Sequence, residues 1–138
     1  MFICLHCQAP VTNNKPIGTK HRNHCPFCLY SRHVDQKTSG DRQADCQAKM
    51  KPIGLTFKKE GRDKWGQVRQ GELMLIHHCL KCGKLVINRI AGDDQPETII
   101  KLLENKISPP QRQKLKAAGI QPLSKKDRPE IKRQLFGK

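Results

Sequence analysis

The stretch Arg22-Asn23-His24-Cys25-Pro26-Phe27-Cys28 decides the fold predicted for this chain, because it places two cysteines two residues apart around a proline that favours a turn. A matching pair, Cys4 and Cys7, lies near the start of the chain, and 17 residues separate the two pairs. Two such Cys-x-x-Cys turns can place four sulfurs at the corners of a tetrahedron around one zinc ion. We therefore predict a first zinc site made of these four cysteines.

The alternative for the cysteines is a set of disulfides in a small secreted domain. Residues 1–7 lack the charged segment and the longer apolar run of a signal peptide, and no stretch of the sequence reaches membrane-spanning length. Cysteine pairs at this spacing in such a chain are more typical of metal sites. We therefore expect metal-bound thiolates, no membrane association and a reducing cytoplasmic location.

A third pair, Cys79 and Cys82, gives the strongest local zinc signal in the sequence. Apolar runs at residues 71–76 and 85–87 flank it and predict a strand on each side. Gly83 directly follows the second cysteine, where a knuckle of this kind commonly needs a positive φ. This pair is therefore expected to form half of a second zinc site.

Cys46 has no neighbouring cysteine, and it precedes an apolar segment at residues 50–57. That segment predicts a strand that pairs with residues 71–76, which would bring Cys46 toward the third cysteine pair. The predicted second site is therefore Cys46, Cys79, Cys82 and one histidine. Spacing alone also allows Cys46 to be a spare thiol, or the third pair to join the first pair instead.

The histidine of the second site is predicted to be His33. Asp35 would face the same side of an extended chain and could orient the imidazole through a hydrogen bond to its second nitrogen. The alternatives, in order of preference, are His77, His78 and His24. The last two directly adjoin a cysteine, and a histidine in that position more often packs outside the metal shell.

The signature Arg22-Asn23-His24-Cys25-Pro26 resembles that of the RNHCP domain family. Further similar positions are Phe2, Cys4, Cys7, Cys28-Leu29, His33-Val34-Asp35, Gly40-Asp41-Arg42, Cys46, Met50, Cys79, Cys82-Gly83, Asn88-Arg89 and Asp93-Asp94. The resemblance covers roughly residues 2–94 and implies a compact domain rich in metal ligands. It implies little about activity.

Composition supports a fold that depends on metal. Of the 138 residues only 36% are hydrophobic and 4% aromatic, which is little for a core of this size, and bound zinc can supply the missing folding energy. We predict a small β-rich domain with zinc-ribbon-like knuckles over residues 1–94. A basic, short-helical or partly disordered tail is predicted over residues 95–138.

The predicted tail has no cysteine or histidine, and it carries a net charge of +7 in 44 residues. Its sequence predicts three short helices: one from Pro96 to Lys106, one capped by Ser108 and ending before Gly119, and one that runs to about Phe136 after a capping box of Asp127 and Glu130. The hydrophobic faces of the last two are weak. We therefore expect this tail to be mobile in isolation.

The whole chain has a formal net charge of +15. Seven ionised thiols and two divalent ions would leave about +12, which favours a polyanionic partner such as nucleic acid. One Trp and one Tyr offer little surface for base stacking, so structured RNA, with the ribosome as one setting, is favoured over DNA. The predicted contacts with nucleic acid are Arg22, Arg32, Lys58, Lys59, Arg62, Lys64, Arg89, Lys125, Lys126, Arg128, Lys132 and Arg133.

Two other functions fit the same sequence. A metal-dependent nuclease would use the His33 and Asp35 region beside a zinc that keeps an open coordination position. A protein adapter would present Asn88, Arg89, Asp93 and Asp94 to a partner, although the two aspartates also suit an ordinary turn and helix cap. The oligomeric state is left open.

Overall fold

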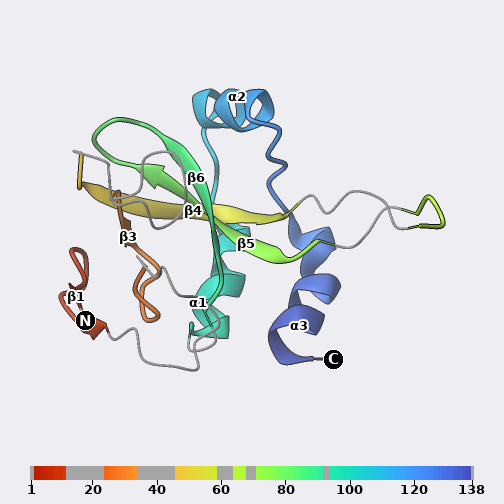
Figure 1. Ribbon diagram of the computed structural model, residues 1–138, viewed down its shortest axis with the longest axis horizontal. Helices are drawn as coiled ribbons and strands as arrows, with labels where there is room; N and C mark the ends of the chain where they lie inside the picture. Colours follow the sequence, from red (N-terminus) through yellow and green to blue (C-terminus); the bar gives the residue numbers. More distant parts are fainter. Residues whose placement is uncertain are drawn as a thin grey trace.

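The computed structural model describes residues 2–11, 24–33, 46–58, 64–67, 71–91 and 94–137 (Figure 1). The predicted metal ligands all fall within these ranges. Asp35 and three of the predicted nucleic-acid contacts, Arg22, Lys59 and Arg62, lie outside the described residues.

A four-stranded antiparallel sheet forms the centre of the molecule, in the order β3-β4-β5-β6. The predicted pairing of residues 50–57 with 71–76 is confirmed, since β4 (Lys49–Phe57) pairs with β5 (Leu73–Cys79). The sheet is completed by β3 (Ser31–Arg32) beside β4 and by β6 (Leu85–Arg89) beside β5. A separate two-stranded hairpin joins β1 (Phe2–Ile3) to β2 (Pro10–Val11) and holds the first cysteine pair between its strands.

Both faces of the sheet are buried because side chains of β5 alternate between two hydrophobic clusters. Leu73 and Leu75 pack with Ile99, Leu103 and Ile131 of the C-terminal region on one face. On the opposite face, Ile76 packs in a second cluster with Ile53 and Leu115. A register shift between Pro52 and Gly54 lets β4 supply Ile53 to that second cluster.

The C-terminal helices pack against both faces of the sheet. Helix α1 (Pro96–Lys101) continues into the 3-10 turn η1 (Leu102–Glu104), and α2 (Pro109–Ala117) starts at a capping box formed by Ser108 and Gln111. The 3-10 turn η2 (Lys125–Asp127) precedes α3 (Arg128–Phe136). Figure 1 shows α2 over one side of the sheet and α1 and α3 over the other.

The predicted capping box of Asp127 and Glu130 is wrong. The carboxylate of Asp127 instead accepts from the backbone N–H of Ser124, 2.9 Å away, and so caps η2. The carboxylate of Glu130 pairs with Arg133 on the same helix. A capping box requires an N-terminal residue in extended backbone, and Asp127 is already helical with φ −89° and ψ −1°.

The boundary predicted after residue 94 does not divide the hydrophobic core. Ile99, Leu115 and Ile131 are each fully buried, and the backbone N–H of Leu123 donates to the carbonyl of Leu55 in β4 at 2.8 Å. The helices therefore pack as part of the folded unit, and the mobility expected of this tail in isolation stays a prediction. The physical reason is that a sheet with two apolar faces needs a layer on each side.

Candidate metal centres

The three Cys-x-x-Cys turns share one backbone pattern. In each, the N–H of the first cysteine donates to the carbonyl five residues later, and the N–H four residues later donates back to the carbonyl of that cysteine. The residue four positions after the first cysteine has a positive φ: Gln8 62°, Leu29 67° and Gly83 81°. The prediction for Gly83 is thus confirmed. The other two turns adopt the same conformation with residues that gave no such signal.

Backbone N–H groups point at the sulfurs in each turn. The N–H groups of His6 and Cys7 lie 3.4 and 3.5 Å from the Sγ of Cys4, and the N–H of Phe27 lies 3.4 Å from the Sγ of Cys25. The N–H of Cys82 lies 3.5 Å from the Sγ of Cys79. Such donors stabilise the thiolate, which is the form that binds metal.

The first cluster brings together the four cysteines predicted for site one. Their sulfurs all lie within 4.8 Å of one another, with 3.5 Å between Cys4 and Cys28 and 3.6 Å between Cys7 and Cys25. Sulfurs bound tetrahedrally about 2.3 Å from one ion lie about 3.8 Å apart. The pairs therefore already have nearly the spacing that a metal ion requires, and the crossed pairing is not the one observed.

The second cluster joins His33, Cys46, Cys79 and Cys82. The Sγ atoms of Cys46 and Cys79 are 3.5 Å apart, and the Nδ1 of His33 is 3.4 Å from the Sγ of Cys82. Strand pairing explains this arrangement, because Met50 opposes Cys79 and Ser31 opposes Met50 across β3, β4 and β5. Residues far apart in the sequence are thereby brought to one end of the sheet.

His33 presents Nδ1 to the sulfurs, and its Nε2 is buried with no hydrogen-bond partner among the described residues. A metal-bound imidazole keeps a proton on its other nitrogen, and that proton normally needs an acceptor. Asp35 was predicted for this role from its position two residues later. It lies outside the described residues.

One cysteine in each cluster has a lowered pKa. Burial acts to raise the pKa of Cys4, but the N–H groups of Cys7 and His6 and the neighbouring thiols outweigh it and lower the value to about 7. Burial of Cys79 is likewise outweighed by the N–H groups of Cys82 and Lys81, and its pKa falls to about 6. Burial raises the pKa of Cys28 well above its ordinary value. Each cluster thus contains one thiol that ionises near neutral pH.

The other candidate histidines have different partners. The Nε2 of His77 donates to the carbonyl of Leu29 at 2.6 Å, so its Nδ1 is left to accept from the Asn88 amide at 2.8 Å. Burial, followed by the nearby His24, lowers the pKa of His77 to about 3, so the ring is neutral. His78 lies beside Gln111 of α2, with 3.4 Å between its Nδ1 and the amide nitrogen.

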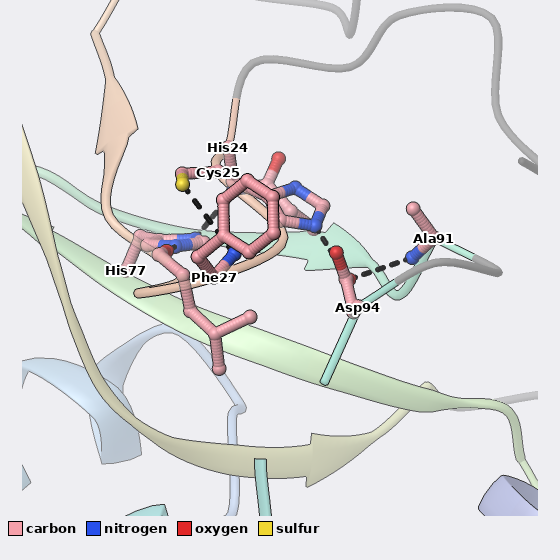
Figure 2. Close-up of polar contacts among 8 residues, drawn as sticks. His24, Cys25, Phe27, His77, Ala91 and Asp94 are labelled. Carbon is pink, nitrogen blue, oxygen red and sulfur yellow. Dashed lines mark hydrogen bonds and ion pairs between the residues drawn. The ribbon is translucent and has the colours of Figure 1, made fainter. Parts of the chain in front are cut away.

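His24 forms a buried pair with Asp94. Its Nε2 lies 2.6 Å from Oδ2 of Asp94, which also accepts from the backbone N–H of Ala91 at 2.8 Å, and both side chains are almost completely buried (Figure 2). Figure 2 shows the His24 ring directed at Asp94, with His77 on the other side of it. Asp94 was interpreted as a turn or cap residue, and the sequence pattern carried no signal for a partner 70 residues away.

Helix α2 contacts the turn that carries two ligands of the second cluster. The ammonium of Lys114 donates to the carbonyl of Gly83 at 3.3 Å, next to the knuckle of Cys79 and Cys82. A positive charge at this position favours a cluster whose thiolates carry excess negative charge. The C-terminal region thus contributes to the metal centre as well as to the core.

The described cations among the predicted nucleic-acid contacts differ in what surrounds them. Ion pairs engage Arg89, which contacts Glu72 at 3.2 Å, and Arg133, which contacts Glu130. Arg32 donates to the Gln47 side chain at 3.0 Å. The exposed lysines are Lys58, Lys64, Lys125, Lys126 and Lys132, and Arg128 is half-buried.

The aromatic side chains offer two separate contacts. Tyr30 stacks on His6, with ring centroids 3.6 Å apart and an angle of 4° between the planes. Trp65 is 77% exposed and lies under the ammonium of Lys64, 5.2 Å from the ring centroid. Among the described aromatic residues Trp65 is therefore the most exposed, followed by Phe136 at 51% and Phe27 at 50%.

Within the part of the chain that the structure describes, no helix is long and apolar enough to cross a membrane. The model of the RNHCP domain matches residues 1–100, so the chain belongs to the RNHCP family. No curated protein and no solved structure matches the chain. Family membership and the two Cys/His clusters together identify a β-rich domain that can hold two metal ions, with donors consistent with zinc.

Proposed function

We propose that this member of the RNHCP family is a zinc-stabilised, cytoplasmic protein that binds structured RNA, with the ribosome as its setting. The observation that carries the proposal is the formal charge of +15 on the chain. All seven cysteines and His33 lie in two clusters that could each hold a metal ion. Basic side chains that remain exposed on a small rigid domain can follow an RNA backbone.

The donors support zinc as the metal. Four thiolates at one cluster and three thiolates with one imidazole at the other are the ligand sets of structural zinc sites. Both clusters join segments from different parts of the chain, so the ions would hold the hairpin β1–β2 and the end of the sheet in place. The surface loops and helices are then presented in fixed positions.

The four-donor set at the second cluster favours binding over catalysis. A catalytic zinc keeps one position for water, whereas His33 and three cysteines here offer four ligand atoms, enough to fill all four positions of a tetrahedral ion. The same placement favours a structural role for His33 over that of the general base that a nuclease would need. We therefore prefer a binding protein to a nuclease.

A protein adapter is the second candidate, and exposed apolar side chains at the knuckles favour it. Leu5, Phe27 and Leu80 each lie within a Cys-x-x-Cys turn and are 39%, 50% and 54% exposed. Tips of this kind can insert into a partner protein. The two functions differ in their dependence on salt.

RNA affinity measured against salt tests the proposal. For an RNA hairpin, log affinity should fall linearly with log salt concentration, by roughly 0.7 to 0.9 per phosphate contacted. The hairpin should also compete better than duplex DNA of equal length. Salt-insensitive binding, or no binding at about 10 μM protein and physiological salt, would remove the RNA function and favour the adapter.

A further inference from the structure

A cavity of about 390 Å³ opens between η1, the segment that leads into α2, and η2. Three cations line it, namely Arg112, Lys125 and Lys126, and no aspartate or glutamate does so among the described residues. Its volume falls in the range of sites that bind small molecules, about 300 to 1,000 Å³. The site is concave and its charged side chains are all positive, which distinguishes it from a flat basic surface.

Hydrogen bonds to β4 hold the walls of the cavity in place. The amide of Asn105 donates to the carbonyl of Ile53 at 3.1 Å, and the N–H of Leu123 donates to the carbonyl of Leu55 at 2.8 Å. The Thr56 hydroxyl donates to the carbonyl of Gln121, also at 2.8 Å. The two segments that flank the cavity are thus tied to one strand, which makes its shape a fixed property of the fold.

Two hydrogen bonds near these cations bear on how they could bind an anion. The Nε of Arg112 donates to the carbonyl of Ile107 at 3.2 Å, which ties the guanidinium to another residue that lines the cavity. Asp127, the nearest acid in sequence to the two lysines, is occupied by the N–H of Ser124. An arginine with two terminal nitrogens can bind a phosphate through paired hydrogen bonds, and lysines add compact charges.

The remaining wall is apolar. Leu102, Leu103, Ile107 and Leu123 line the cavity, and these side chains also pack against the hydrophobic clusters of the sheet. A sugar or a base could lie against such a wall while its phosphate contacts the cations. Inorganic phosphate would use only the charged half.

We infer that this cavity binds the phosphate of a nucleotide, with the sugar or base against the apolar wall. The inference rests on the proposed function and narrows it to one place on the surface. The nucleotide could come from an RNA chain or be free in solution, and both sources share the same chemistry. The two can be separated by experiment.

The test uses the full-length, zinc-loaded chain and amide NMR titrations with inorganic phosphate, AMP and an RNA hairpin. The variant Lys125→Gln/Lys126→Gln removes two charges from the cavity. Lys51→Gln/Lys101→Gln removes two charges from exposed lysines that do not line it. An unchanged pattern of amide resonances in the free proteins would show that both variants fold.

We expect AMP to shift the amides of Gly54, Leu103 and Ser124, all of which line the cavity. The cavity variant should weaken binding by about tenfold or more, since hydrogen bonds to charged groups are strong, while the control variant should stay within about twofold. Phosphate should shift the same amides more weakly. Shifts spread over the surface, or equal losses in both variants, would overturn the cavity site.

The RNA arm separates this inference from the proposed function. AMP binding without hairpin binding would support the cavity as a site for free nucleotides and would contradict the RNA function. Hairpin binding that both variants weaken equally would support the RNA function and overturn the cavity. Hairpin binding that depends on Lys125 and Lys126 would support both, and failure of all three ligands to bind would overturn both.

Discussion

At the scale of single residues, the histidines near the cysteines take three different roles. His33 lies in the second cluster, His24 forms a buried pair with Asp94, and His77 is a neutral ring held by Leu29 and Asn88. The role of each histidine depends on which atom its ring nitrogens face, and not on whether a cysteine is next to it in the sequence.

Substitution of His33 should show that it is the fourth ligand of the second site. His33→Ala should retain the first metal ion and lower the affinity of the second site for its ion. Loss of a group that only orients a ligand typically lowers metal affinity by about 10- to 100-fold, and the loss here should be larger. His33→Cys should keep both ions, because four thiolates also bind zinc. Zinc content after dialysis against a chelator of graded strength provides the measurement.

His77→Ala is the matched control for that experiment. It removes a buried ring whose two hydrogen bonds serve Leu29 and Asn88, so it should lower the free energy of unfolding by about 1 to 3 kcal/mol for each unpaired group. Both metal ions should nevertheless be retained in the folded protein. A variant that folds but holds a single ion would make His77 the ligand.

The pair of His24 and Asp94 should contribute strongly to stability, because removal of one partner leaves a buried polar or charged group. We expect Asp94→Ala to lower the free energy of unfolding by about 3 to 5 kcal/mol. The double variant His24→Ala/Asp94→Ala should cost less than the sum of the single variants. Urea unfolding with saturating zinc would measure this, and strict additivity would contradict coupling between the two residues.

At the scale of elements, the C-terminal helices act as the two outer layers of the sheet. Leu115 of α2 and Ile131 of α3 are both fully buried, on opposite faces. Each helix has few apolar residues, yet Leu115 is enough to join α2 to the core, and Ile131 with Leu135 joins α3. A basic helix is therefore compatible with an ordered position here.

Leu115→Ala should lower the free energy of unfolding by about 2 to 5 kcal/mol, since it removes a fully buried side chain and leaves a cavity against Ile76. Lys116→Ala, on the exposed side of the same helix, should stay within about 0.5 kcal/mol. Thermal or urea unfolding would compare the two. Equal and small effects would mean that α2 is a detachable tail after all.

At the scale of the whole molecule, local patterns predicted the knuckles, the central strand pair and the starts of α1 and α2. Each of these depends on residues close in sequence or on one apolar run. The pairing of His24 with Asp94 was missed because nothing local marks a partner 70 residues away. The outer helices were judged by their own weak apolar faces, although the continuous apolar run 73–76 requires cover on both sides.

Metal content is the most direct test of the central claim that two four-ligand clusters hold this fold together. Protein purified under reducing conditions should contain two zinc ions per chain, and X-ray absorption should report an average of about 3.5 sulfur and 0.5 nitrogen neighbours per zinc, as seven thiolates and one imidazole require. A folded protein with one zinc ion or none would contradict the account.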